Sequence, residues 1–305
     1  MTEVIDERKL KLGYLQILAA AIIWGTYGLF VRALDYSPEY ILFHRFLFGF
    51  IGLLVFISIR GGLVSLRPAL AHWKWMLIPA LLTGLSWLAY TYSLTFTTVA
   101  NAVFLIYTAP VFTVLFAPLM LKEKLELKSI AALFVSLLGT GAIMGYTGLF
   151  SSGGSLLGDI IALLGGMTYG FLALFLKRAP REILGLPSNV MLSGYIALVL
   201  LPFVIISPGR FSWEGFLILL VLGLFQQSFG TTLFHLGLQS VKAQHAGILT
   251  YIEPLAATLM AALFLYEGLT WGSILGGGLI MAGGMIVILK KDARKVVKGP
   301  PPRYF

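Results

Sequence analysis

The sequence predicts an all-α integral membrane protein of ten transmembrane helices, arranged as two inverted five-helix repeats. Three observations predict this fold class. Hydrophobic residues make up 58% of the 305 positions and charged residues only 11%, against roughly 25% charged in a soluble domain. The apolar residues form ten runs of about the 20 residues that cross a bilayer as a helix, without the alternation of barrel strands. The two halves of the chain also share motifs.

Short connections that carry Gly, Pro and charged residues separate the ten predicted spans. The spans are Gly13–Val31, Tyr40–Ile59, Trp75–Phe96, Val99–Leu121, Ser129–Tyr146, Leu156–Leu176, Val190–Ile206, Phe216–Leu238, Ala246–Tyr266 and Trp271–Leu289. The boundary between the third and fourth spans is the least defined, because their connection is the shortest. The chain therefore divides into a cytoplasmic N-terminal tail 1–12, a first repeat 13–146, a second repeat 156–289 and a basic cytoplasmic tail 290–305.

The basic residues predict the orientation of these spans. With the N-terminus inside, all but three of the 22 Lys and Arg residues fall on the cytoplasmic side, the exceptions being Arg32, Arg45 and Arg210. Cytoplasmic loops carry such an excess of positive charge. We therefore expect a multi-pass protein of the cytoplasmic (inner) membrane with both termini in the cytoplasm. Because the net charge of +9 lies between apolar runs, it indicates membrane topology and no nucleic-acid partner.

The internal repeat appears when the sequence is shifted by 144 positions. In that register the matches include Tyr107/Tyr251, Pro110/Pro254 and Glu123/Glu267. Because five is an odd number, the second repeat must enter the membrane from the opposite side. Inverted repeats are typical of alternating-access carriers, with the substrate site near the midplane. The alternative is a duplication kept for stability alone, in a scaffold.

Several short segments carry a resemblance to a known family. They are Ala-Ile-Ile-Trp-Gly-Thr at 21–26, the Arg45 segment, Ala109-Pro110 with Lys122-Glu123-Lys124, and Glu253-Pro254 with Tyr266-Glu267. The chain resembles the drug/metabolite transporter superfamily, in particular its ten-span EamA branch. The resemblance implies a secondary carrier of amino acids, other metabolites or drugs, often outward, with a central cavity formed by spans 1–4 and 6–9. Members that carry sugar phosphates or nucleotide sugars use basic residues inside their late spans. Spans six to ten have none here, which argues against phosphate-bearing substrates.

Two ionisable residues within the predicted spans are candidates for gating or coupling. Glu253 lies close to the midplane of the ninth span, directly before Pro254. A charge at this depth is costly and marks a functional site by default, so Glu253 could bind an amine or load a proton. Alternatively, it could brace the proline kink. Arg45 could reach the outer interface, or gate the outer mouth by pairing with an acid such as Asp159, Glu39 or Asp35.

Polar side chains form a stripe on two helices related by the repeat. In the eighth span Gln227, Thr231 and His235 recur every four residues, which places them on one helical face. The same shift aligns them with Thr83, Trp87 and Thr91 in the third span. We expect both stripes to face a wet cavity, and hydrogen bonds between helices are the alternative.

Two matched prolines predict helix kinks beside aromatic residues. Pro110 and Pro254 each remove a hydrogen bond from the carbonyl four residues earlier, and a cavity could solvate those carbonyls. Six aromatic residues could then line a pocket: Trp24, Tyr27, Tyr90, Tyr107, Tyr169 and Tyr251. An aromatic wall with a midplane acid and no midplane base suits cationic, zwitterionic or apolar-bodied solutes.

Other chemistries lack their signatures. The sequence has no cysteine, no G-x-x-x-x-G-K-[ST] loop and no H-E-x-x-H, so we expect no enzyme, no metal, no cofactor and no ATP-driven pump. The expected partners are a small-molecule solute and the lipid bilayer, with protons as a candidate coupling ion. Monomer and homodimer both stay open. The alternatives to a transporter are a membrane-embedded enzyme, a channel or a scaffold of the same architecture.

Overall fold

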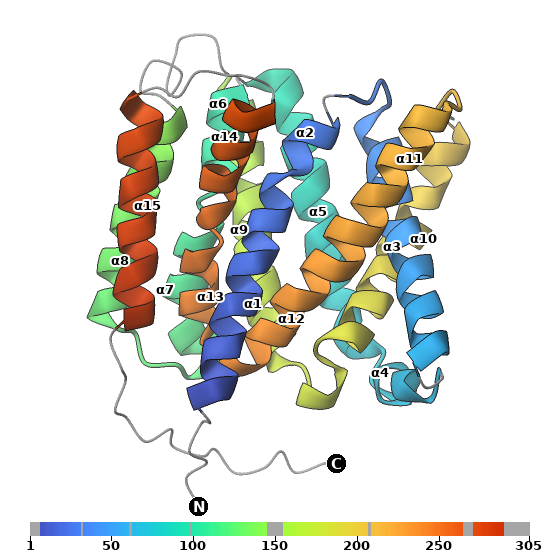
Figure 1. Cartoon of the computed structure of the whole chain (residues 1–305), viewed down its shortest axis with the longest axis horizontal. Coiled ribbons are helices and arrows are strands. Elements are labelled where there is room, and N and C mark those ends of the chain that lie inside the picture. The colour runs from blue at the N-terminus through green and yellow to red at the C-terminus, as the bar shows by residue number, and fades with distance from the viewer. Residues whose placement is uncertain are drawn as a thin grey trace, which may run out of the picture.

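The structure is a computed structural model that describes residues 7–31, 33–60, 63–97, 99–144, 155–206, 209–264 and 271–289. The predicted tail 290–305, the first half of the N-terminal tail (residues 1–6), Arg32, Tyr266 and Glu267 lie outside these ranges. All regular elements in the described ranges are helical, and the long helices run side by side through one bundle (Figure 1). We call the end of the bundle where α1 begins and α15 ends the terminal end, and the opposite end the far end.

In the described ranges, the first repeat contains eight α-helices and one 3₁₀ turn. In chain order they are α1 (Glu7–Gly25), α2 (Tyr27–Val31), α3 (Pro38–Arg60), η1 (Leu63–Leu66), α4 (Arg67–Ala71), α5 (Lys74–Phe96), α6 (Val99–Ile106), α7 (Ala109–Leu121) and α8 (Leu127–Met144). The second repeat contains α9 (Leu156–Arg178), η2 (Arg181–Ile183), α10 (Leu186–Ile206), α11 (Trp213–Val221), η3 (Leu222–Gly230), α12 (Thr231–Ser240), α13 (Ala243–Leu249), α14 (Ile252–Phe264) and α15 (Trp271–Leu289).

Eight segments of the described chain are long and apolar enough to cross a membrane, and α8 is a shorter apolar helix. Helix α5 has 23 residues, but its Thr, Ser, Trp and Tyr side chains lower its hydropathy and it is not among the eight. Helices α5 and α8 occupy the places of the predicted third and fifth spans. The prediction of an all-helical membrane fold is confirmed, and eight of the ten predicted spans meet the length and composition of a membrane helix.

The two repeats run in opposite directions. Helix α1 begins at the terminal end, whereas its counterpart α9 begins at the far end, where α5 ends (Figure 1). A backbone hydrogen bond of 3.0 Å from Ser155 N to Phe96 O joins the start of α9 to the end of α5. This arrangement confirms the inverted repeat.

Three of the predicted spans are broken helices. The first span divides into α1 and α2 at Thr26, the fourth into α6 and α7 before Pro110, and the ninth into α13 and α14 before Pro254. Pro254 cannot donate to the carbonyl of Thr250, and that oxygen accepts a hydrogen bond of 2.9 Å from Glu253 N instead. Each break lies within a few residues of an aromatic side chain that the sequence marks as a pocket candidate.

The eighth span differs from the continuous α-helix that the sequence predicts. Its middle, η3, is π-helical between α11 and α12. Asn189 of α10 supports this segment, because its Nδ2 donates to Gln227 O at 2.7 Å, Ser228 O at 3.2 Å and Thr232 Oγ1 at 2.9 Å. Long π-helical stretches are rare and often lie at functional sites.

Small residues allow close helix contact beside the breaks. A Cβ added to Gly166 of α9 would lie 2.5 Å from Leu105 O of α6, and one added to Gly170 would lie 2.4 Å from Ala109 O of α7. Helix α9 therefore lies directly against the backbone of the fourth span. This contact positions the α6–α7 break beside the centre of the bundle.

Candidate functional site

A cavity of about 180 Å³ lies inside the bundle, between helices of both repeats. Twelve of the residues predicted for the site line this cavity: Trp24, Tyr27, Arg45, Thr83, Trp87, Tyr90, Tyr107, Tyr169, Gln227, Thr231, His235 and Glu253. They come from spans one to four, six, eight and nine.

Two predicted residues lie elsewhere. Thr91 does not line the cavity, because Thr83, Ser86, Trp87 and Tyr90 define the lining face of α5 and Thr91 lies roughly 90° from its centre at 100° per residue. Tyr251 is fully buried, and it packs in an apolar cluster with Val114 and Ile280. Thus the repeat-related tyrosines differ, with Tyr107 at the cavity and Tyr251 outside it.

The cavity also contains residues that the sequence analysis did not single out. They are Phe46, Ser86, Val103, Ile106, Leu172, Leu176, Leu192 and Phe234. All but Ser86 are apolar, so no compositional signal separates them from the other apolar residues of the spans. Ser86 could have been found as part of the α5 face, since it lies one turn from Tyr90.

Arg45 is buried at one side of the cavity, with 5% of its surface exposed. Its guanidinium carbon lies 5.0 Å from the ring centre of Tyr27 and 5.3 Å from that of Trp87. Contacts of this kind stabilise a cation by about 0.5–2 kcal/mol. Its Nε has no hydrogen-bond partner in the described chain. Arg45 thus adds a base to the cavity, where the sequence had predicted none. Within the described ranges no ion pair joins it to Asp35, Glu39 or Asp159, and its role in gating stays a prediction.

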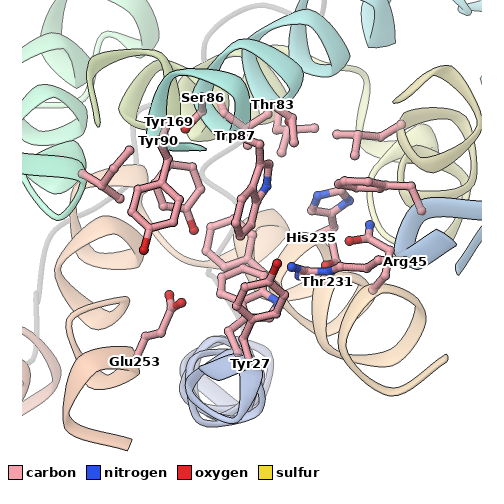
Figure 2. Close-up of a pocket in the computed structure, with 18 of the residues that line it drawn as sticks. Tyr27, Arg45, Thr83, Ser86, Trp87, Tyr90, Tyr169, Thr231, His235 and Glu253 are labelled. Atoms are coloured by element: carbon pink, nitrogen blue, oxygen red, sulfur yellow. The ribbon is translucent and has the colours of Figure 1, made fainter. Parts of the chain in front are cut away.

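Glu253 lies at the opposite side of the same cavity, in the first turn of α14. Figure 2 shows the hydroxyls of Tyr90 and Tyr169 directed toward its carboxylate, and shows Arg45 and Tyr27 across the cavity. Glu253 and Arg45 thus face the same cavity from two sides. Aromatic rings form much of the wall between them.

Neighbouring helices hold two polar residues of the eighth span. The Nε2 of Gln227 donates to Asn189 Oδ1 at 2.9 Å and to Ser193 Oγ at 3.1 Å. His235 Nδ1 and Ser188 Oγ lie 2.8 Å apart. The polar stripe of the eighth span therefore makes hydrogen bonds to neighbouring helices and also lines the cavity, so both arrangements considered for it occur together. Trp24 Nε1, also at the cavity, has no partner among the described residues.

Nothing in the described ranges gathers three or more His, Cys, Asp or Glu side chains as a metal would require. The chemistry available in the cavity is recognition of an organic solute. A cation and a carboxylate provide charge, tyrosine and indole groups provide hydrogen bonds, and the rings provide apolar surface.

Comparison with known proteins gives the chain its family. The model of the EamA-like transporter family matches residues 11–145 and again residues 156–289. An uncharacterized transporter of Archaeoglobus fulgidus is 29% identical over 92% of this chain and 97% of its own length. The uncharacterized transporter YoaV of Bacillus subtilis is 24% identical over 92% of this chain and 98% of its own length. The uncharacterized inner membrane transporter YicL of Salmonella typhimurium is 25% identical over 93% of this chain and 96% of its own length.

A solved crystal structure has the same fold. It superimposes with a TM-score of 0.76 at 20% identity, covering 91% of this chain and 97% of the other. The family model accounts for both repeats, and the relatives span almost the full length. The chain is a membrane transporter that belongs to the EamA-like transporter family.

Proposed function

We propose that this transporter moves a small organic metabolite, an amino acid, an amine or a similar compound, across the cytoplasmic membrane by alternating access, in the direction of export. The observation that carries the proposal is the pair of opposite charges at the two sides of the cavity, Arg45 and Glu253. A zwitterion matches this pair, with its carboxylate toward Arg45 and its ammonium toward Glu253. An amine without a carboxylate would use Glu253 alone.

The surroundings of the two charges support this substrate class. Arg45 has an unpartnered Nε, and a guanidinium can bind a carboxylate through two N–H groups. The hydroxyls of Tyr90 and Tyr169 that point toward Glu253 could share in binding an ammonium group. The aromatic rings suit the apolar body of a solute, and the cavity volume limits that body to a small one.

The inverted repeats support alternating access, because rocking of one repeat against the other would open the cavity to each side in turn. We place the terminal end in the cytoplasm, since that orientation puts most Lys and Arg residues inside. We propose export as the direction because the chain resembles carriers that often move their solutes out of the cell. Protons are a candidate coupling ion, with Glu253 as the residue to load one.

Counterflow into proteoliposomes tests the proposal. Vesicles preloaded with one unlabelled amino acid or amine should accumulate the same labelled compound transiently, and the compound should be recovered unchanged. Amino acids, primary amines, nucleobases and sugar phosphates should be compared in one series. Accumulation of sugar phosphates but not of amino acids or amines would overturn the substrate class, and a chemically altered product would overturn the transport mechanism.

A further inference from the structure

A second cluster of charged residues closes the terminal end of the bundle, away from the cavity. Its centre is Glu126, in the connection between α7 and α8. Its carboxylate contacts Lys242 Nζ through one oxygen, and the other oxygen lies 3.2 Å from His245 Nε2 and 3.3 Å from Lys128 Nζ. Three positive or polarisable groups therefore converge on one acid.

The cluster joins the two repeats. His245 of α13 lies between Glu126 and Tyr14 of α1, whose hydroxyl is 2.6 Å from His245 Nδ1. A neutral imidazole that carries its proton on Nε2 satisfies both contacts, donating to Glu126 and accepting from Tyr14. The first repeat thus contributes Tyr14 and Glu126, and the second contributes Lys242 and His245.

Glu123, three residues earlier in the same connection, makes a second set of contacts. Its Oε1 accepts from Ala243 N at 3.1 Å and lies 3.8 Å from Lys177 Nζ at the end of α9. Lys177 Nζ in turn donates to the carbonyls of Leu238, at 3.1 Å, and Val241. The α7–α8 connection is thereby tied to the ends of α9 and α12 and to the start of α13.

A dry apolar layer separates this cluster from the cavity. Six residues of one packed core have no exposed surface there: Ile17, Leu176, Leu238, Val241, Ala246 and Leu249. Leu176 also lines the cavity, so the layer begins where the cavity ends. A solute that leaves the cavity toward the terminal end must separate these side chains and the ionic contacts beyond them.

The far end does not repeat this charge pattern. The 144-residue shift places Thr98, Asn101 and Thr270 at the positions of Lys242, His245 and Glu126, and all three are neutral. Asn101 contacts an acid, since its Nδ2 lies 3.3 Å from Asp159 Oδ1, and Thr97 Oγ1 donates to the same oxygen at 2.6 Å. Asp159 does not hold the repeat position of Glu126, so the acid at the far end is contacted by a different set of residues.

We infer that Glu126, Lys242 and His245 form a gate of the transport cycle, which holds the cavity closed toward the terminal end until its ionic contacts separate. This inference rests on the alternating access proposed above. Because Thr98, Asn101 and Thr270 are neutral at the positions of Lys242, His245 and Glu126, the gate biases the resting transporter toward the state that is closed on the terminal side. Glu126 acts in this gate by joining the repeats, not by touching the solute.

Cysteine accessibility tests the gate without a substrate. The chain has no cysteine, so Ala246→Cys places a single thiol in the dry layer. A membrane-impermeant maleimide is applied from the terminal side in oriented vesicles. Glu126→Gln should raise the labelling rate about tenfold, which corresponds to about 1.4 kcal/mol. Lys242→Gln should do the same, and the double variant should add little, because both substitutions open one contact.

The matched control is Lys124→Gln, an exposed lysine of the same connection whose side chain is outside the gate. Its labelling rate should equal that of the parent. Rates for Glu126→Gln and Lys242→Gln that match this control would overturn the inference, provided that size-exclusion profiles show folded protein. If Glu126→Gln does not fold, Lys242→Gln alone decides the question. Failure to transport amino acids or amines would refute the proposed function but leave the labelling result valid.

Discussion

Arg45 and Glu253 place a guanidinium and a carboxyl group at two sides of one cavity, and no ion pair joins them in the part of the chain that the structure describes. Two charges this deeply placed would ordinarily be paired or neutralised. Arg45 instead lies over aromatic rings, and Glu253 faces tyrosine hydroxyls. The cavity between them is the place where a solute of matching charges would complete both interactions.

Replacing Glu253 tests its role in this arrangement. Glu253→Gln should abolish counterflow of both amines and amino acids, because among the described residues that line the cavity it removes the only acid. The thermal unfolding temperature should stay the same or rise, since a buried charge is removed. Glu214→Gln, an exposed acid in the first turn of α11, is the control. Counterflow that survives in Glu253→Gln would assign the residue to the kink and not to the solute.

The rings beside Arg45 should set its position. Trp87→Leu should weaken amino acid binding by about fivefold, since a cation–π contact stabilises by about 1 kcal/mol. Trp87→Phe, which keeps an aromatic face, should weaken it less. Isothermal titration with the best counterflow substrate measures both. Equal affinities for Trp87→Leu and the parent protein would show that the ring does not position the guanidinium.

The two repeat-related tyrosines should respond differently to loss of the hydroxyl. Tyr107 lines the cavity, so Tyr107→Phe should weaken solute binding by about tenfold, the scale of one hydrogen bond to a charged group. The Tyr251 hydroxyl is buried without a hydrogen-bond partner in the described chain. Tyr251→Phe should leave binding unchanged and increase stability by up to about 1 kcal/mol. Titration and thermal unfolding separate the two variants, and a reversed pattern would contradict the placement of the cavity.

Two helical glycines form a matched pair for packing. A Cβ at Gly170 of α9 would lie 2.4 Å from Ala109 O, whereas one at Gly84 of α5 would have nothing within 4 Å. Gly170→Ala should therefore destabilise the protein by about 1–3 kcal/mol. Gly84→Ala should stabilise it by up to about 1 kcal/mol, as Ala favours a helix. Denaturation in mild detergent measures both, and a stable Gly170→Ala variant would mean that α9 and α7 are not in close contact.

The acid at the terminal end should make stability depend on pH. Hydrogen bonds from His245, and then from Lys242, hold the pKa of the Glu126 carboxyl well below its ordinary value of 4.5. A lowered folded-state pKa adds stability that is complete above the unfolded pKa and is lost as the pH falls through the folded one. Glu126→Gln should thus destabilise the protein at pH 7. The difference in unfolding temperature between the variant and the parent protein should shrink below about pH 4.5. Thermal unfolding at pH 3 to 7 checks this, and a constant difference would contradict it.

Much of the fold follows from features that the sequence states directly. Long apolar runs and the distribution of Lys and Arg predict membrane helices, and the Pro110/Pro254 register reveals the repeat. Twelve of the fourteen residues named for the pocket or for coupling line one cavity, because charged, amide and aromatic side chains avoid lipid and gather where protein surrounds them. Their part in transport stays a prediction.

The remaining features depend on tertiary contacts that periodicity does not contain. Tyr251 matches Tyr107 in sequence, but it packs on the other side of its broken helix. Leu172 and Phe234 line the cavity, yet they look like any other apolar residue of a span. The π-helical segment η3 depends on Asn189, which is 38 positions away from Gln227, so no local pattern around Gln227 predicts it.

That π-helical segment gives the transporter a means of changing its specificity without any change in side-chain chemistry. Each residue rotates an α-helix by about 100°, so deletion of one position within Leu222–Gly230 would turn α11 relative to α12. As a result, either Gln227 or the pair Thr231 and His235 would no longer line the cavity. Length variation at this one point of the chain would change which polar groups line the cavity, and α11 would have to repack against α3. Natural relatives that differ here by a single residue are the ones in which a changed solute preference should first be sought.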